Sequence, residues 1–206
     1  AIWKGHLENL LPRVKASQGH HAAMNYKEVP ALMEILQRNT SQSSLALQFT
    51  ILNALRTSEG LYTQKSEINS GILTIPANRM KGNQEHQVPL SQPSLNLIAR
   101  LPNLDIASDL LFHNNGKPLS NMSMLMLLRR IQPNLTVHGF RSSFRDWVAE
   151  ETNHSPEVAE MALAHKIANK VEAAYRRGKL IERRRVLMED WASYCMSACT
   201  TYSSTA

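Results

Sequence analysis

The sequence predicts an α+β domain that is mainly α and contains one small antiparallel β-sheet. Most apolar residues recur at helical spacings of three and four, whereas two short runs near the middle of the chain have β-type composition. The chain has 206 residues, of which 43% are hydrophobic, as is ordinary for a globular protein. This length is sufficient for one well-packed domain with a short additional segment.

The N-terminal residues look like the end of a preceding element. Apolar residues with roughly helical spacing stop at Pro12, and the stretch 15–23 has the composition of a linker. The chain opens with Ala1 rather than Met, so we expect a piece of a longer protein. Residues 1–22 are therefore assigned to a linker.

Two helices are predicted next, followed by a hairpin. The first begins near Val29-Pro30, a polar break covers 38–44, and a strongly apolar second helix covers 45–55. The runs Ile72-Leu-Thr-Ile-Pro76 and His86-Gln-Val-Pro-Leu90 then predict two antiparallel strands. A third strand is expected near Glu67-Ile68.

The rest of the chain is predicted to be helical. Helices are expected from Ser91, from Ser120 and after Gly139, and Ser155-Pro156 is a helix start with a capping serine. The methionine-rich stripe after Ser120 (Met122, Leu125, Met126, Leu128) is interpreted as core.

The C-terminal region is predicted to form two further helices. Asn169 can cap the first of them, and Gly178 is expected to end it. The last helix carries one stripe of mainly apolar residues at spacings of three and four, formed by Leu180, Arg184, Leu187, Met188, Trp191 and Cys195.

Charge favours a polyanionic partner. The net charge is +6 and the sequence pI is about 9.5. The run 176–185 reads Arg-Arg-Gly-Lys-Leu-Ile-Glu-Arg-Arg-Arg, which is typical of a nucleic-acid contact but equally of a solvated helix face. No apolar run approaches the length of a membrane span, and no signal-peptide pattern opens the chain. Cys195 and Cys199 form neither a disulfide framework nor a strong zinc motif, so a reducing cytoplasm is expected.

Several residues could cleave a phosphodiester without a metal. A pair of arginines would neutralise the phosphate oxygens, while tyrosine, lysine and histidine could attack or move protons. His138 and Arg141 are three residues apart, so a helix places both on one face. His165 and Tyr175 are ten residues apart, and on one unbroken helix they would face different ways. They can meet at one phosphate only if the chain bends between them, for which 167–169 is the best candidate.

Five segments together carry a resemblance to a known family. They are Trp3–Leu11, Ala54–Glu59, Ile75–Lys81 with His86–Leu90, Thr136–Trp147 and Leu163–Tyr175. In this order and over nearly the whole chain, they resemble the tyrosine recombinases, most closely the P4-like integrases of prophages and genomic islands.

The resemblance implies the catalytic-domain fold of DNA breaking-rejoining enzymes over residues 23–195. Residues 1–22 would then end a preceding core-binding domain, and 196–206 would form a flexible tail. The implied function is site-specific DNA recombination that integrates or excises a mobile element through a 3′-phosphotyrosine intermediate. No cofactor and no metal are implied.

Residue roles follow from the same resemblance. Tyr175 would be the nucleophile and Lys81 the general acid, and Glu59 would support the site. The phosphate would be held by the residues Arg56, Arg141, His138 and His165. Contacts to DNA would come from Arg176, Arg177, Lys179 and Arg183. Three other histidines are expected at the surface or in loops: His86, His113 and His154.

The implied partner is duplex DNA at attachment sites, bound by a tetramer of the full-length protein. A DNA-bending protein and an excisionase are possible accessory partners, and the location would be the nucleoid in a bacterial cytoplasm. One departure is Lys65, which stands where the P4-like group usually has a tryptophan. An integrase remnant that only binds DNA is the main alternative. A type IB topoisomerase and a phosphatase remain further alternatives.

Overall fold

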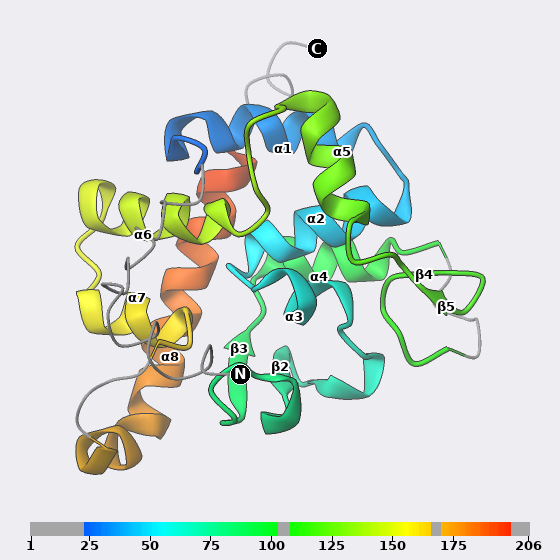
Figure 1. Cartoon of the computed structure of the whole chain (residues 1–206). Coiled ribbons are helices and arrows are strands. Elements are labelled where there is room, and N and C mark those ends of the chain that lie inside the picture. Colours follow the sequence, from blue (N-terminus) through cyan, green and yellow to red (C-terminus); the bar gives the residue numbers. More distant parts are fainter. Residues whose placement is uncertain (1–22, 103–107, 166–169, 199–206) are drawn as a thin grey trace, which may run out of the picture.

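The computed structural model describes residues 23–102, 108–165 and 170–198, and side chains from 180 onward in the last helix (Figure 1). The described α-helices are α1 Val29–Gln37, α2 Gln42–Leu52, α3 Thr57–Leu61, α4 Gln92–Ala99, α5 Ser123–Ile131, α6 Gly139–Glu151, α7 Pro156–Ala162 and α8 Lys170–Met196. Short 3₁₀ turns are η1 Tyr26–Glu28, η2 Lys65–Glu67 and η3 Ala77–Arg79. In the described part of the chain, no helix is both long and apolar enough to cross a bilayer.

Helix α2 lies at the centre of the fold because apolar side chains surround it. From Ala46 to Leu52 every residue is buried, so α2 needs partners on all sides. Helices α1, α4, α5 and α8 all contact it. A helix of this kind is a core element, as the sequence predicted.

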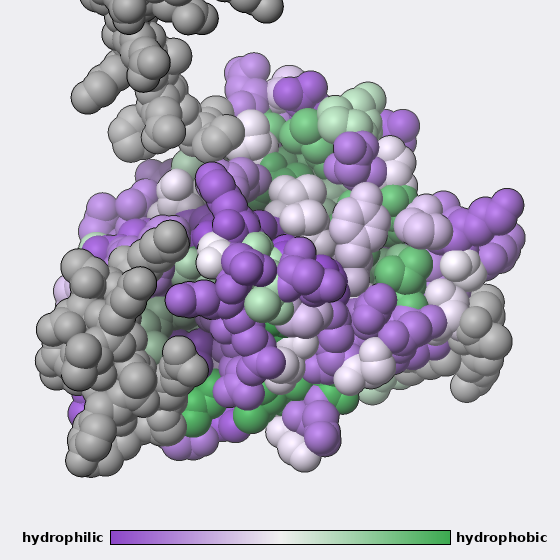
Figure 2. Space-filling view, turned by 60° about the horizontal axis from the view of Figure 1, so that its bottom comes forward, coloured by the Kyte–Doolittle hydropathy of each residue, from purple (hydrophilic) through white to green (hydrophobic). Residues whose placement is uncertain are grey.

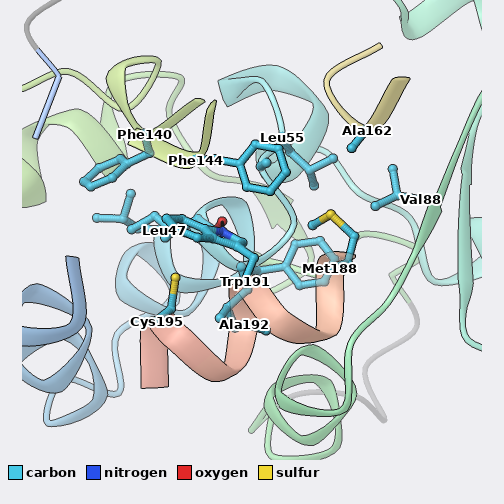
Figure 3. Close-up of a cluster of buried hydrophobic side chains, with 14 of the residues drawn as sticks. Leu47, Leu55, Val88, Phe140, Phe144, Ala162, Met188, Trp191, Ala192 and Cys195 are labelled. Atoms are coloured by element: carbon cyan, nitrogen blue, oxygen red, sulfur yellow. Dashed lines mark hydrogen bonds between the residues drawn. The ribbon is translucent and has the colours of Figure 1, made fainter. Parts of the chain in front are cut away.

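Helix α8 seals the core with the predicted stripe, whose six members are all buried. Trp191 lies at its centre, where its ring packs edge-on against Phe144 with 5.4 Å between centroids (Figure 3). The indole Nε1 donates a 2.9 Å hydrogen bond to the Ile51 carbonyl of α2. Truncating such a buried tryptophan to alanine costs roughly 3–5 kcal/mol, so this contact fixes α8 against the core.

A three-stranded antiparallel sheet projects from one end of the helical body, with strands β1 Ile68–Asn69, β2 Ile72–Ile75 and β3 His86–Pro89 in that order (Figure 1). The pair Ile75↔His86 closes the β2–β3 hairpin. The predicted hairpin and third strand are confirmed. A second sheet of two strands, β4 His113–Asn114 and β5 Lys117–Pro118, was not predicted. Its turn is Asn115-Gly116 with positive φ at both residues, a hairpin signal that the sequence does carry.

Several local predictions are wrong. Helix α8 continues through Gly178 instead of ending there. Helix α2 ends at Leu52, before the predicted limit. In the methionine-rich segment, Met122 and Met126 are exposed, and the core positions are Met124 and Leu128. His86 and His113 are buried rather than at the surface. The linker 1–22 and the tail beyond 198 lie outside the described residues.

Candidate active site

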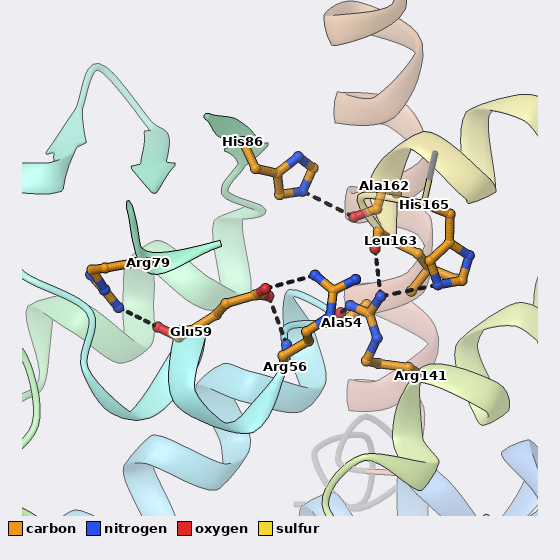
Figure 4. A network of polar contacts seen from close by, with 9 residues as sticks. All are labelled: Ala54, Arg56, Glu59, Arg79, His86, Arg141, Ala162, Leu163 and His165. Atoms are coloured by element: carbon orange, nitrogen blue, oxygen red, sulfur yellow. Dashed lines mark hydrogen bonds and ion pairs between the residues drawn. The ribbon is translucent and has the colours of Figure 1, made fainter. Parts of the chain in front are cut away.

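Arg141 is the buried centre of the candidate site. It lies in the first turn of α6 and is only 5% exposed. Its Nη1 donates to the Ala54 carbonyl at 2.7 Å, and its Nη2 donates to the Leu163 carbonyl (Figure 4). The guanidinium therefore joins the end of α2 to the end of α7.

The two helix ends held by Arg141 share one backbone motif. Ala54 and Ala164 have φ of 48° and 50°, in the left-handed region that a Schellman helix end requires. The matching bonds run from the Leu55 amide to the Thr50 carbonyl and from the His165 amide to the Glu160 carbonyl, both at 3.0 Å. Each motif turns the chain sharply, so Arg56 and His165 begin the segments that follow.

Arg56 begins α3 as its N-cap residue, where Glu59 holds it twice. One Glu59 oxygen accepts the Arg56 amide at 2.9 Å, and the other accepts Arg56 Nη1 at 2.7 Å. The Glu59 side chain is 2% exposed and that of Arg56 is 21% exposed. A buried carboxylate thus orients a guanidinium that still reaches the surface.

Gly60 allows α3 to approach α2 closely enough for this arrangement. A Cβ at Gly60 would lie 2.2 Å from Thr50 Oγ1, a distance that real Cβ atoms do not show. Thr50 in turn accepts the amide of Leu55 at the end of α2. The glycine beside Glu59 is therefore a packing requirement of the helix pair that presents Arg56.

The two arginines are electrostatic neighbours. Burial, and then the charge of Arg56, lower the pKa of Arg141 to about 10. Figure 4 shows both guanidinium groups between α3 and the end of α7. Arg141 remains charged at neutral pH, so two cations converge here with Glu59 as a buried counter-ion. Such a site favours an anion whose oxygens can accept hydrogen bonds from both guanidinium groups.

The two predicted histidines flank Arg141. His165 follows α7, and its Nε2 lies 3.3 Å from Arg141 Nη2, while 47% of its side chain is exposed. His138 is the exposed N-cap residue of α6, one turn before Arg141. The structure therefore brings Arg56, Arg141 and His165 together, with His138 at the start of the same helix as Arg141.

Lys81 is exposed in the turn between β2 and β3. Its neighbour Arg79 is instead bonded to other groups of the protein. Both carboxylate oxygens of Glu67 accept Arg79 Nη1, and the Glu59 carbonyl accepts Arg79 Nη2 at 3.1 Å. Arg79 thus ties the turn to α3, and of these two cations Lys81 is the one left at the surface.

The turn end of strand β3 in the same hairpin is fixed to the helical body by two buried groups. His86 Nε2 lies 3.2 Å from the Ala162 carbonyl of α7, and Arg184 of α8 donates to the Gln87 carbonyl at 2.7 Å. Burial first, and then the charge of Arg184, lower the pKa of His86 to about 4. A neutral His86 therefore donates to Ala162, close to the motif that ends in His165. Sequence reasoning missed this role.

The predicted nucleophile lies in α8, but its side chain is outside the described residues, as are those of Arg176, Arg177 and Lys179. Helix α7 ends at Ala162 and α8 begins at Lys170, so His165 and Tyr175 are not on one unbroken helix. The predicted bend at 167–169 lies outside the described residues. In the basic run, Arg183 is exposed, whereas Arg184 faces the interior. The run is therefore not uniformly a DNA-facing surface.

The end of the molecule that carries the hairpin is mainly hydrophilic where it is described (Figure 2). This surface suits a polar, charged partner better than an apolar one. Among the described residues, no three His, Cys, Asp or Glu side chains converge as metal ligands would. The described side chains offer anion binding by guanidinium groups and proton movement by imidazole.

The fold matches that of a solved protein structure. A solved structure, a lambda integrase(75–356) dimer bound to a COC′ core site, matches with a TM-score of 0.57 and 15% identity, over 82% of this chain and 60% of that chain. The DNA breaking-rejoining fold predicted from the sequence is thereby confirmed.

Sequence comparison identifies the family. The family model described as the phage integrase family matches residues 23–179. The prophage integrase IntZ of Escherichia coli (strain K12) is 33% identical over 181 residues, which is 84% of this chain and 45% of IntZ. The integrase of Enterobacteria phage P4 is 27% identical over 199 residues, or 85% of this chain and 45% of that protein. The chain belongs to the phage integrase family, and it spans less than half the length of these two relatives.

Proposed function

We propose that this chain is the catalytic part of a tyrosine recombinase that integrates or excises a prophage or genomic island. The observation that carries the proposal is the convergence of Arg56, Arg141 and His165 in a member of the phage integrase family. Tyr175 lies within the segment that the family model matches. Two guanidinium groups and an imidazole are suited to stabilise the charge of a phosphoryl group during transfer.

The proposed reaction balances without an external energy source. The Tyr175 oxygen attacks phosphorus and its proton passes to His165 or water, while the bond to the 5′-oxygen breaks and Lys81 supplies the proton that this oxygen takes. The product is a 3′-phosphotyrosyl bond and a 5′-hydroxyl. Because one phosphodiester replaces another, attack by a 5′-hydroxyl on the same phosphorus reseals the strand.

The DNA contacts are proposed to be mostly to phosphates, through Arg176, Arg177, Lys179 and Arg183. Phosphate contacts position a protein on the duplex, but they carry little sequence information. We further propose that the full-length protein acts as a tetramer on two attachment sites in the bacterial nucleoid. Upstream segments would read the sequence, and a DNA-bending protein and an excisionase could set the direction of recombination.

A suicide substrate tests the chemistry. The full-length protein is incubated with nicked attachment-site DNA in EDTA, and a covalent protein–DNA adduct is sought on a denaturing gel. We expect an adduct from the wild type and none from Tyr175→Phe. An adduct that persists in Tyr175→Phe would refute the nucleophile, and a requirement for added magnesium would refute the metal-free mechanism. Specific DNA binding without any adduct would favour the decayed remnant.

A further inference from the structure

Glu160, in α7, makes two strong side-chain contacts that the roles proposed so far do not explain. Its Oε2 accepts a hydrogen bond from His165 Nδ1 at 2.6 Å, and its Oε1 accepts one from Arg145 Nε, also at 2.6 Å. Arg145 lies one helical turn after Arg141 on α6. The carboxylate therefore connects α6 to the imidazole beside Arg141.

The ionisation of Glu160 fixes which nitrogen of His165 carries hydrogen. Burial raises the pKa of the Glu160 carboxyl, but the hydrogen bonds and charges of His165 and Arg145 outweigh burial and hold it below its ordinary value. An ionised carboxylate only accepts hydrogen bonds, so Nδ1 of His165 must be the donor. In the neutral imidazole, Nε2 is then an acceptor, and it lies 3.3 Å from Arg141 Nη2, a donor.

The backbone reinforces this orientation. The His165 amide donates to the Glu160 carbonyl at 3.0 Å in the Schellman motif that ends α7. His165 is therefore held by Glu160 at its main chain and at its side chain. Arg145 removes the remaining freedom of the carboxylate by occupying its other oxygen. With both oxygens engaged, the imidazole has one favoured rotamer and one favoured tautomer.

We propose that Glu160, locked by Arg145, is a positioning residue that keeps His165 in the Nδ1–H tautomer with Nε2 facing the arginine pair. The proposal rests on the proposed function: the single lone pair of Nε2, which accepts from Arg141 Nη2 in this structure, would give up that hydrogen bond to take the proton of the attacking tyrosine. Glu160 itself touches neither the DNA nor the reacting atoms. Its effect on the reaction passes entirely through His165.

The first test needs no DNA. In ¹⁵N-histidine NMR spectra of this chain, the His165 signals are assigned by their absence from a His165→Gln variant. At a pH where the ring is neutral, we expect Nδ1–H in the wild type and a mixture of tautomers in Glu160→Ala. Glu160→Gln, which keeps one acceptor oxygen, should restore part of the Nδ1–H signal. A wild-type ring that is predominantly Nε2–H would overturn the assignment.

The second test is a double-variant cycle on adduct formation by the full-length protein with suicide DNA. We expect Glu160→Ala to slow cleavage about 10- to 100-fold, less than the loss of a complete proton-transfer group, with unchanged DNA affinity. In a His165→Ala background, the same substitution should have no further effect, because its action requires the imidazole. An equal slowing in both backgrounds would reduce Glu160 to a structural link between α6 and α7.

The matched control is Glu34→Ala, which breaks the surface ion pair between Glu34 and Arg38 at the C-terminal end of α1, also 2.6 Å long. This variant should cleave at the wild-type rate. The two proposals fail in different ways. An adduct that survives Tyr175→Phe refutes the proposed function, whereas wild-type cleavage rates in Glu160→Ala together with loss of adduct in Tyr175→Phe refute only the role of Glu160.

Discussion

The arginine side and the lysine side of the candidate site are built on different principles. Arg141 is buried and bonded to backbone carbonyls at two helix ends, Ala54 and Leu163, so its guanidinium cannot move without disturbing the core. Lys81 lies exposed in a hairpin turn, and only the surroundings of that turn are anchored, through Arg79 and His86.

This difference matches what each group must do in the proposed reaction. Groups that stabilise developing charge are most effective when they are already oriented, because reorganisation then adds nothing to the barrier. A general acid must instead reach a leaving oxygen whose position depends on bound DNA. A fixed guanidinium and an exposed lysine on an anchored hairpin satisfy both needs.

The largest expected loss of stability comes from replacing Arg141, the centre of the arginine side. Arg141→Met leaves the buried carbonyls of Ala54 and Leu163 without their donor, so the free energy of unfolding should fall by about 2–5 kcal/mol. Urea denaturation measures this loss. Arg141→Lys should recover only part of it, since an ammonium lacks the planar fork that spans two carbonyls.

The control for that prediction is Arg38→Met, which removes an exposed guanidinium paired with Glu34. Surface pairs of this kind contribute about 0–1 kcal/mol, so the change should be small. If Arg141→Met and Arg38→Met lose equal stability, the interpretation of Arg141 as a structural link between two helix ends is wrong.

On the lysine side, the stability that His86 contributes at the hairpin should depend on pH. The pKa of His86 is about 4 in the folded protein, against about 6.5 in an unfolded chain. The unfolded state thus binds a proton first as the pH falls, so stability is complete above pH 6.5 and is lost towards pH 4. The full loss is about 3 kcal/mol, and about 2 kcal/mol of it should be gone at pH 5.

His86→Gln isolates this contribution. Glutamine can still donate an N–H to the Ala162 carbonyl but does not titrate in this range. Urea denaturation at pH 7, 6 and 5 should show a drop for the wild type that exceeds the drop for the variant by about 2 kcal/mol. Parallel pH curves would mean that His86 is not held neutral in the folded protein.

Local patterns predicted most of the elements but not the partners of the key side chains. Ser155 caps α7 as expected, since its side chain accepts the Val158 amide. The glycine rule failed at Gly178: α8 runs through this position, and a glycine in a helix interior costs only about 1 kcal/mol. The bonds of Arg141 join residues 87 and 22 positions away, and no local spacing encodes them.

The same dependence on distant contacts explains why the partner of His165 and the burial of His86 were not predicted. His165 was recognised from a motif, but its partner Glu160 was not, because nothing in the sequence distinguishes this carboxylate from surface ones. His86 was expected at the surface or in a loop, where most histidines that are not fully buried lie. Its burial depends on α7 and α8, which fold over the hairpin from far along the chain.

The smallest expected change in stability concerns Ala54 and Ala164, the two alanines at the helix ends around Arg141. A left-handed conformation costs a non-glycine residue roughly 1–2 kcal/mol, whereas glycine gains unfolded-state entropy of about 0.4–1 kcal/mol. Ala54→Gly and Ala164→Gly should therefore each raise the free energy of unfolding by about 0.5 kcal/mol. The matched controls are Ala46→Gly within α2 and Ala159→Gly within α7, both buried in helix interiors, which should lower it by about 1 kcal/mol. Urea denaturation of the four variants and the wild type should therefore show stability changes of opposite sign for the same substitution. Loss of stability in Ala54→Gly and Ala164→Gly would show that neither helix end has the left-handed geometry on which the arginine side depends.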